Sequence, residues 1–127
     1  MPPSMPGAWP GDGVPARVTS SEGPAGLRLE VAGELDLGST PAVRGDLVSA
    51  LEALPRGATA VLDLTPTTYL ASAGVGMILA LMSEAGGRGI DLRLRSAEGS
   101  ATERVFALTG LGGLLEAAAV AAAPSAD

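Results

Sequence analysis

Segments with the period of a β-strand alternate along this chain with segments with the period of an α-helix. In the stretch 27–31, Leu and Val alternate with Arg and Glu, which is typical of a strand with one buried face. The short apolar runs at 61–64 and 92–94 predict two more strands. Val18 precedes the turn at 20–26 and is expected in a partner strand. Strands that alternate with helices usually form parallel sheets with helical crossovers, so we expect an α/β domain whose early antiparallel pair makes the sheet mixed.

Between the predicted strands, apolar residues recur at helical spacing. The segment 39–54 carries Val or Leu at four positions on one face, with Thr40 as the expected N-cap and Pro41 at the first helical position. Pro55 and Gly57 are expected to end this helix, because neither residue continues a helix well.

Two further helices are expected in the second half of the chain. The first runs from about Ala73 to Ala85 and closes at the glycine pair 86–87, whose freedom at positive φ suits the end of a helix. The second begins at residues 100–103, which form an S-x-x-E capping box, and ends at Gly110.

The chain has 127 residues, a length that fits one domain. Residues 1–16 are rich in Pro and Gly and are expected to form a flexible tail. Residues 17–116 are expected to form the domain, and residues 117–127 an alanine-rich C-terminal tail. The expected architecture is a small mixed sheet of about four to five strands packed with about three to four helices.

Cys and His are both absent from the chain. Their absence excludes disulfides, thiolate chemistry, the usual base of Ser/His/Asp catalysis and the commonest ligands of zinc and haem iron. We therefore expect neither an enzyme nor a protein that holds a metal or another cofactor.

The net charge of −6, with only eight scattered basic residues, argues against a nucleic-acid partner. The N-terminus has no basic region and is interrupted by prolines, so it does not resemble a signal peptide. No apolar run reaches the length of about 18 residues that a membrane span needs. We therefore expect a cytoplasmic protein that does not insert into a membrane.

Ser72 lies between a short apolar run and a glycine-punctuated apolar segment, which places its hydroxyl at the start of a helix. The unpaired N–H groups and partial positive charge of a helix start suit an anion such as phosphate. An ordinary N-cap is the alternative, because Ser is a preferred capping residue. A serine-hydrolase elbow is a poor match, since Leu70 stands two positions earlier and the chain has no His.

The helix expected after Ser72 has two apolar stripes. One stripe consists of four residues that share a face, Val75, Ile78, Leu79 and Met82. Met77 and Leu81 lie off this stripe, at i, i+4 spacing. Either the helix is wedged between core elements, or the second stripe forms a partner-binding face with Gly74 and an adaptable methionine.

Acidic residues lie at or just beyond the ends of predicted strands, where α/β folds place functional groups. They are Glu34, Asp36 and Asp63. Carboxylates in such places perform acid–base chemistry or hold a metal. Because these acids are few and widely separated, solvated loop positions are the alternative.

Several short motifs follow one another in a recognisable order. They are GELD at 33–36, Thr40, DLT at 63–65, ASAGVG at 71–76 and VFALTGL at 105–111. In this order and spacing, the chain resembles a STAS domain of the anti-sigma factor antagonist type over residues of about 17–116.

The resemblance implies a regulatory binding protein. Bacterial members of the family bind an anti-sigma factor that is itself a serine kinase, and this binding frees the sigma factor. The first serine of the family motif D-S-[ST]-G is phosphorylated, and Ser72 occupies that position, with Ala71 where the motif has Asp and Ala73 after it. A phosphate at a helix start adds nearly two negative charges and spoils a fitted interface, so phosphorylation is expected to switch binding off.

Together, the resemblance and the residue patterns imply one partner-binding surface around the GELD loop and Ser72. Its expected members are Glu34, Asp36, Thr40, Asp63, Ser72, Ala73, Gly74, Gly76, Met77 and Leu81. Some stand-alone STAS domains serve instead as accessory subunits of transport or lipid-trafficking complexes, and an unphosphorylated scaffold is a further alternative. The sequence leaves the oligomeric state open.

Overall fold

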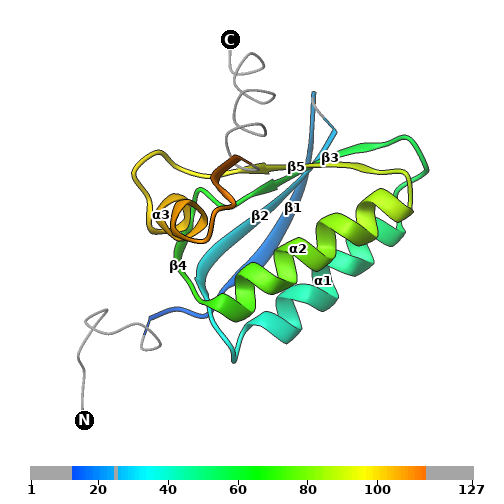
Figure 1. Cartoon of the computed structure of the whole chain (residues 1–127). Coiled ribbons are helices and arrows are strands. Elements are labelled where there is room, and N and C mark those ends of the chain that lie inside the picture. The colour runs from blue at the N-terminus through cyan, green and yellow to red at the C-terminus, as the bar shows by residue number, and fades with distance from the viewer. Residues whose placement is uncertain (1–12, 25, 114–127) are drawn as a thin grey trace.

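The computed structural model describes residues 13–24 and 26–113. Within them, a five-stranded sheet packs against helices (Figure 1). In chain order the elements are β1 (Arg17–Gly23), β2 (Gly26–Leu35), α1 (Thr40–Glu52), β3 (Thr59–Asp63), β4 (Thr67–Leu70), α2 (Ser72–Gly87), β5 (Asp91–Arg95) and α3 (Ala101–Leu108). The predicted C-terminal tail at 117–127, and residues 1–12 of the predicted N-terminal tail, lie outside the described residues.

The strands lie in the order β1-β2-β3-β5, and β4 pairs with the second half of β2. β1 and β2 are antiparallel, whereas β2–β3, β3–β5 and β2–β4 are parallel. The prediction of a mixed α/β sheet is therefore confirmed. β4 was not predicted, because its segment was expected to be a loop.

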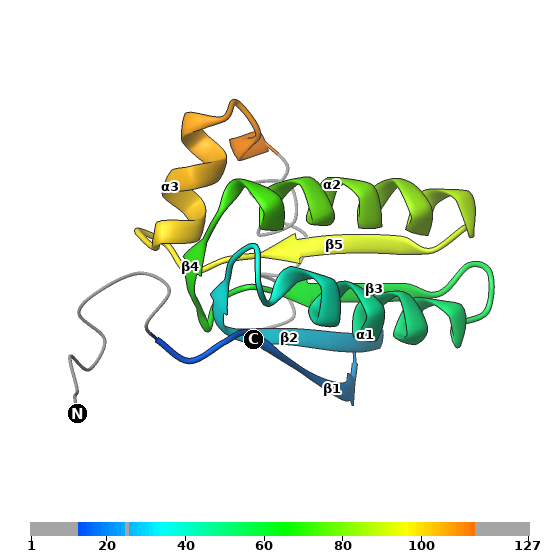
Figure 2. The ribbon, with the colours of Figure 1, turned by 90° about the horizontal axis from the view of Figure 1, so that it is seen from below.

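Helices α1 and α2 lie side by side on one face of the sheet and run in the same direction (Figure 1, Figure 2). Helix α3 packs beside β4 at one end of the sheet. The largest fully buried side chains are Phe106, Leu29, Leu35, Leu47, Leu51, Leu62, Leu64, Ile78, Leu81, Leu94, Val31 and Val43. In the described part of the chain, no helix has both the length and the apolar character that crossing a membrane requires.

Strand β2 changes its parallel partner halfway along. Its first half pairs with β3 and its second half with β4, and the register shifts between Gly33 and Glu34. Gly33 has a φ of 107°, and a Cβ there would lie 2.8 Å from the carbonyl oxygens of Val14 and Pro15. Only glycine therefore fits this irregular position without displacing the neighbouring chain.

The last residues of the predicted flexible tail are bound to the sheet. Ala16 donates its N–H to the carbonyl of Glu34 at 2.9 Å, and Glu34 donates its N–H to the carbonyl of Val14 at 2.8 Å. The prediction that the flexible tail extends to residue 16 is thus wrong for residues 14–16, because their backbone groups are paired with β2.

The first helix begins at Thr40, so the prediction of Thr40 as its N-cap is wrong. Ser39 precedes the helix, and the Thr40 hydroxyl donates to the carbonyl of Asp36 at 2.6 Å. Pro41 lies in the first turn, as predicted. The Thr40 side chain therefore joins the helix to the turn that follows β2.

Helix α2 is longer at both ends than the sequence predicted. It begins at Ser72 and continues through Gly86 and Gly87. The N–H of Arg88 still bonds to carbonyls of the last helical turn. The first glycine with positive φ after α2 is therefore Gly89, at 73°. The helix thus ends at the predicted glycine pair, but the expected positive φ lies two to three residues later, at Gly89.

The capping box of α3 is confirmed in its main contact. The hydroxyl of Ser100 accepts a hydrogen bond from the N–H of Glu103 at 3.1 Å. The Glu103 carboxylate accepts from the N–H of Gly99 at 2.7 Å. Gly110, with a φ of 78°, follows the end of the helix as expected.

Candidate functional site

The ends of β2 and β4 bring two separate segments of the chain to one edge of the sheet. Leu35 and Leu70 are register partners in parallel strands, and the N–H of Ala71 donates to the carbonyl of Leu35 at 3.0 Å. The chain leaves β2 at Asp36 and leaves β4 for α2 at Ser72. Since parallel strands end together, the GELD turn and the start of α2 are neighbours at the carboxyl edge, where α1 also starts (Figure 2).

The turn after β2 is held by reciprocal hydrogen bonds between Asp36 and Ser39. The Ser39 N–H donates to Oδ1 of Asp36 at 2.9 Å, the Ser39 hydroxyl oxygen lies 3.1 Å from the same atom, and Ser39 Oγ accepts from the N–H of Asp36 at 3.0 Å. The hydrogen bond from the Ser39 N–H is the main cause that lowers the pKa of the Asp36 carboxyl below its usual value. Asp36 therefore presents a fixed negative charge at this edge, beside the start of α1.

Ser39 and Leu37 are members of this turn that the sequence analysis did not identify. Ser39 also donates its hydroxyl to the carbonyl of Glu34 at 2.8 Å. Leu37, at the tip of the turn, is 79% exposed. The sequence signal for an exposed apolar residue was the leucine that follows the alternating pattern of β2, because an apolar side chain in a turn has few places to bury itself.

Ser72 is exposed and is the first residue of α2. Ala71 is the N-cap, with φ −86° and ψ 167°, and no side chain caps the helix. Within residues 13–24 and 26–113, no acceptor bonds to the backbone N–H of Ser72 or Ala73. The alternative that Ser72 is an ordinary N-cap is therefore wrong, and an exposed hydroxyl stands beside two unpaired N–H groups.

Because Ala71 has extended N-cap geometry but no capping oxygen, Ala71→Asp is expected to stabilise the protein. The new carboxylate would accept from the free N–H groups of the first turn and raise the free energy of unfolding by about 1 kcal/mol. Urea denaturation measures this change. Ala80→Asp, on the exposed side of the same helix, is the control and should give no gain; equal midpoints for the parent and Ala71→Asp would contradict the assignment of the cap.

Gly74 lies in the interior and not on the surface that the sequence analysis considered for it. A Cβ at Gly74 would lie 2.7 Å from Cδ1 of Leu70 and 3.0 Å from Cδ2 of Leu35. The glycine therefore lets the first turn of α2 approach the ends of β2 and β4 closely. Ala73 is half-buried and Gly76 is exposed, so these two remain on the accessible side of the helix near Ser72.

The second apolar stripe of α2 faces the core. Met77 and Leu81 are only 6% and 2% exposed, so neither lies on a surface that a partner can reach. Leu79, predicted in the core stripe, is 37% exposed instead. The helix packs against both α1 and β5 and buries a wider apolar face than one sheet requires. Of the two alternatives given by the sequence, the structure thus has the helix wedged between core elements.

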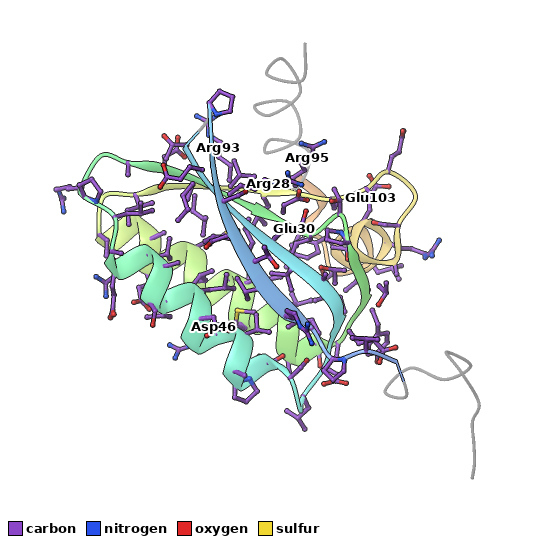
Figure 3. All side chains as sticks on the ribbon, turned by 180° about the vertical axis from the view of Figure 1, so that it is seen from behind. Arg28, Glu30, Asp46, Arg93, Arg95 and Glu103 are labelled. Atoms are coloured by element: carbon purple, nitrogen blue, oxygen red, sulfur yellow. The ribbon has the colours of Figure 1, made fainter. Side chains whose placement is uncertain are left out.

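Asp63 lies apart from Asp36 and Ser72, on the sheet face away from α1 and α2. Its side chain is completely buried and accepts from Nε of Arg28 and from the N–H of Thr65, both at 2.9 Å. Burial raises the pKa of the Asp63 carboxyl, but hydrogen bonds from Thr65 and Arg28 together outweigh it and hold the pKa below its usual value. Figure 3 shows Arg28 and Arg95 on this side of the strands.

The acidic residues do not converge on one site. Glu34 is buried beside the N-terminal segment, and a Cβ at Gly13 would lie 2.5 Å from its carboxylate. Among residues 13–24 and 26–113, no group of three or more His, Cys, Asp or Glu side chains is placed to hold a metal ion. The arrangement favours a binding surface made of Asp36, Thr40 and Ser72 with their neighbours, and it places Asp63 in the framework of the sheet.

Comparisons with known proteins agree with this fold. A family model described as "Mlab, STAS domain" matches residues 18–116. The structure is similar to an anti-sigma factor antagonist from Mycobacterium paratuberculosis, with a TM-score of 0.68 and 23% identity over 79% of this chain and 82% of that chain. It is also similar to the anti-sigma factor antagonist SpoIIAA in its unphosphorylated form, with a TM-score of 0.62 and 20% identity over 78% of this chain and 85% of that chain. No curated protein matches the sequence.

Proposed function

Because the chain belongs to the STAS domain family, we propose that it is an anti-sigma factor antagonist. In this proposal the protein is a cytoplasmic binding protein without catalytic activity or cofactor, and its partner is an anti-sigma factor of the serine-kinase type. Binding this partner releases a sigma factor. The similarity in fold to two antagonists supports the proposal.

The observation that carries the proposal is the meeting of the GELD turn and the start of α2. The hydrogen bond from Ala71 to Leu35 and the Leu35–Leu70 register place Asp36 and Ser72 on neighbouring segments. With Thr40, Ala73 and Gly76, they form the proposed partner surface. Glu34 holds the turn in place, because its backbone carbonyl accepts a hydrogen bond from the Ser39 hydroxyl.

The same geometry supports Ser72 as a phosphorylation switch. Its hydroxyl is exposed, and a phosphate there would lie near the unpaired N–H groups of Ser72 and Ala73, which can hold it without unwinding the helix. The added charge of nearly −2 would stand close to the ionised Asp36 and would repel a partner that fits the unmodified surface. Ala71, in place of the Asp of the family motif, leaves these N–H groups available to the phosphate.

We expect Ser72→Asp to weaken binding of the serine-kinase-type anti-sigma factor by about tenfold or more, since it adds a negative charge at the centre of the surface. Titration calorimetry with the full chain and the purified anti-sigma factor measures this loss. Ser83→Asp, an equal change of charge at an exposed position of α2, is the matched control and should bind as the parent does. Equal affinities for Ser72→Asp and the parent would contradict the switch.

Ser72→Ala tests the modification itself. This variant should retain binding, because the removed hydroxyl makes no hydrogen bond within the described residues. It should also abolish incorporation of phosphate when the chain is incubated with the kinase and ATP, as followed by mass spectrometry of the Ser72 peptide. Phosphate on another residue in the variant would contradict the assignment of the site.

A second candidate function is an accessory subunit of a transport or lipid-trafficking complex. Ala71 and Ala73 favour it, because they depart from the motif around the phosphorylated serine and suit a surface that binds without a phosphate switch. Co-purification of the full chain with an ATPase and a permease, in place of a small kinase, would support this candidate against the first.

A further inference from the structure

Strand β1 is an edge of the sheet. Among residues 13–24 and 26–113, it pairs with β2 on one side only, and all of its residues except Val18 are exposed. In an antiparallel pair, alternate residues turn their N–H and C=O groups away from the partner strand. β1 therefore presents a row of unpaired backbone groups to any strand that approaches it.

The two strands at the ends of the order β1-β2-β3-β5 are protected to different degrees. β5, at the opposite edge, carries a charge at Asp91, Arg93 and Arg95 within five residues. β1 is seven residues long, contains no proline, keeps an unbroken register with β2, and has no charge between Arg17 and Glu22. Edge charges, prolines and bulges are the usual devices that prevent strand pairing, so β1 is the edge open to another strand.

The charges of β1 are polarised along the strand. Arg17 stands at its start and Glu22 near its end, and neither forms an ion pair within the described residues. Two copies of β1 placed antiparallel bring the positive end of each beside the negative end of the other. We propose that β1 pairs antiparallel with β1 of a second copy of this chain and joins the two sheets into one.

Symmetry restricts the register of this pairing. A two-fold axis normal to the sheet keeps the faces of both copies aligned, so opposite residues must point to the same face. The pairing is then centred on Thr19 or on Ser20. Centred on Thr19, it places Arg17 opposite Ser21 of the second copy; centred on Ser20, it places Arg17 opposite Gly23. In both registers Arg17 lies one position from Glu22 of the second copy. The unlike charges attract across the strand pair from opposite faces, without a direct ion pair.

This dimer leaves the proposed partner surface free. The two-fold axis reverses β1, so the carboxyl edges of the parallel strands, with Asp36 and Ser72, lie at opposite ends of the joined sheet. The helices of both copies cover the same face. A protein of this form would present two separate partner surfaces, and the inference does not depend on what those surfaces bind.

Sedimentation of the full chain over a series of concentrations tests the proposal. The expected result is a reversible change from the monomer of 12.5 kDa to a species of twice that mass. Ser20→Lys should raise the dimer dissociation constant by about tenfold, because it places two like charges at the centre of the pairing. Ser49→Lys, an equal change of charge on the exposed side of α1, should leave the constant unchanged. A monomer at every concentration, or a dimer insensitive to Ser20→Lys, would overturn the proposal.

A charge exchange tests the antiparallel direction. Arg17→Glu and Glu22→Arg should each weaken the dimer, because each places like charges at both ends of the pairing. The double variant Arg17→Glu/Glu22→Arg restores unlike charges and should recover most of the affinity. If the double variant is weaker than both single variants, the two strands do not pair antiparallel. Circular dichroism of all variants confirms that the exposed substitutions leave the fold intact.

Discussion

Phe106→Ala is expected to lower the free energy of unfolding by about 4 kcal/mol. Phe106 is the only phenylalanine of the chain and is completely buried. It belongs to α3, whose eight residues are too few to form a stable helix alone and depend on packing beside β4. Truncation leaves a cavity where the helix is anchored, so the loss combines the lost burial with the cost of the cavity. Urea denaturation monitored by circular dichroism measures this change.

Two variants of the same helix serve as controls for Phe106→Ala. Phe106→Leu keeps most of the buried volume and should cost much less, about 1 kcal/mol. Leu108→Ala removes a side chain that is 82% exposed and should change stability by less than about 0.5 kcal/mol. Similar losses for Phe106→Ala and Leu108→Ala would show that α3 does not anchor through its buried face.

Elements with strong periodicity were predicted from the sequence, and β4 was not. Its four residues carry two threonines, so the segment looks polar and short beside the apolar run of β3. Thr67 is nevertheless buried, and its hydroxyl donates to the carbonyl of Val31 at 2.7 Å. This bond joins residues that are 36 positions apart. Local patterns do not encode such a contact, because it exists only once β2 and β4 lie together.

The candidate site was predictable where it depends on strand ends, and less so where it depends on packing. Asp36 follows β2, which was predicted, so the carboxyl-edge rule of α/β folds indicated a functional position for it. Ser72 follows β4, which was not predicted, so its place beside the GELD turn was expected only from the resemblance to the STAS family. The burial of Met77 and the exposure of Leu79 depend on where α1 and β5 lie around α2, and an apolar helix does not show its inner face by composition alone. Asp63 was expected at the partner surface because Arg28, the cation that pairs with it, is 35 positions away in the sequence.

Arg28→Met is expected to lower the free energy of unfolding by about 3 kcal/mol at neutral pH. Arg28 is half-exposed, whereas Asp63 is completely buried and accepts two hydrogen bonds from the guanidinium. Removal of Arg28 leaves a buried carboxylate without its cation, and an uncompensated buried charge costs more than the ion pair contributes. Arg93→Met is the control, because in the described part of the chain the Arg93 side chain bonds only to the exposed Asp91, and its loss should cost less than about 1 kcal/mol.

The pH dependence distinguishes a charge effect from lost packing. In the parent the folded-state pKa of Asp63 is lowered, so its contribution is present above the unfolded-state pKa of about 4 and is lost as the pH falls through the lower folded-state value. In Arg28→Met the guanidinium no longer lowers this pKa, which should therefore lie above that of the parent, so the stability deficit of the variant should grow as the pH rises through this range and shrink in acid. Arg28→Met/Asp63→Asn removes the charge, keeps the acceptor for Thr65, and should recover most of the loss at neutral pH. A deficit that is constant with pH and persists in the double variant would show that Arg28 acts through its packing alone.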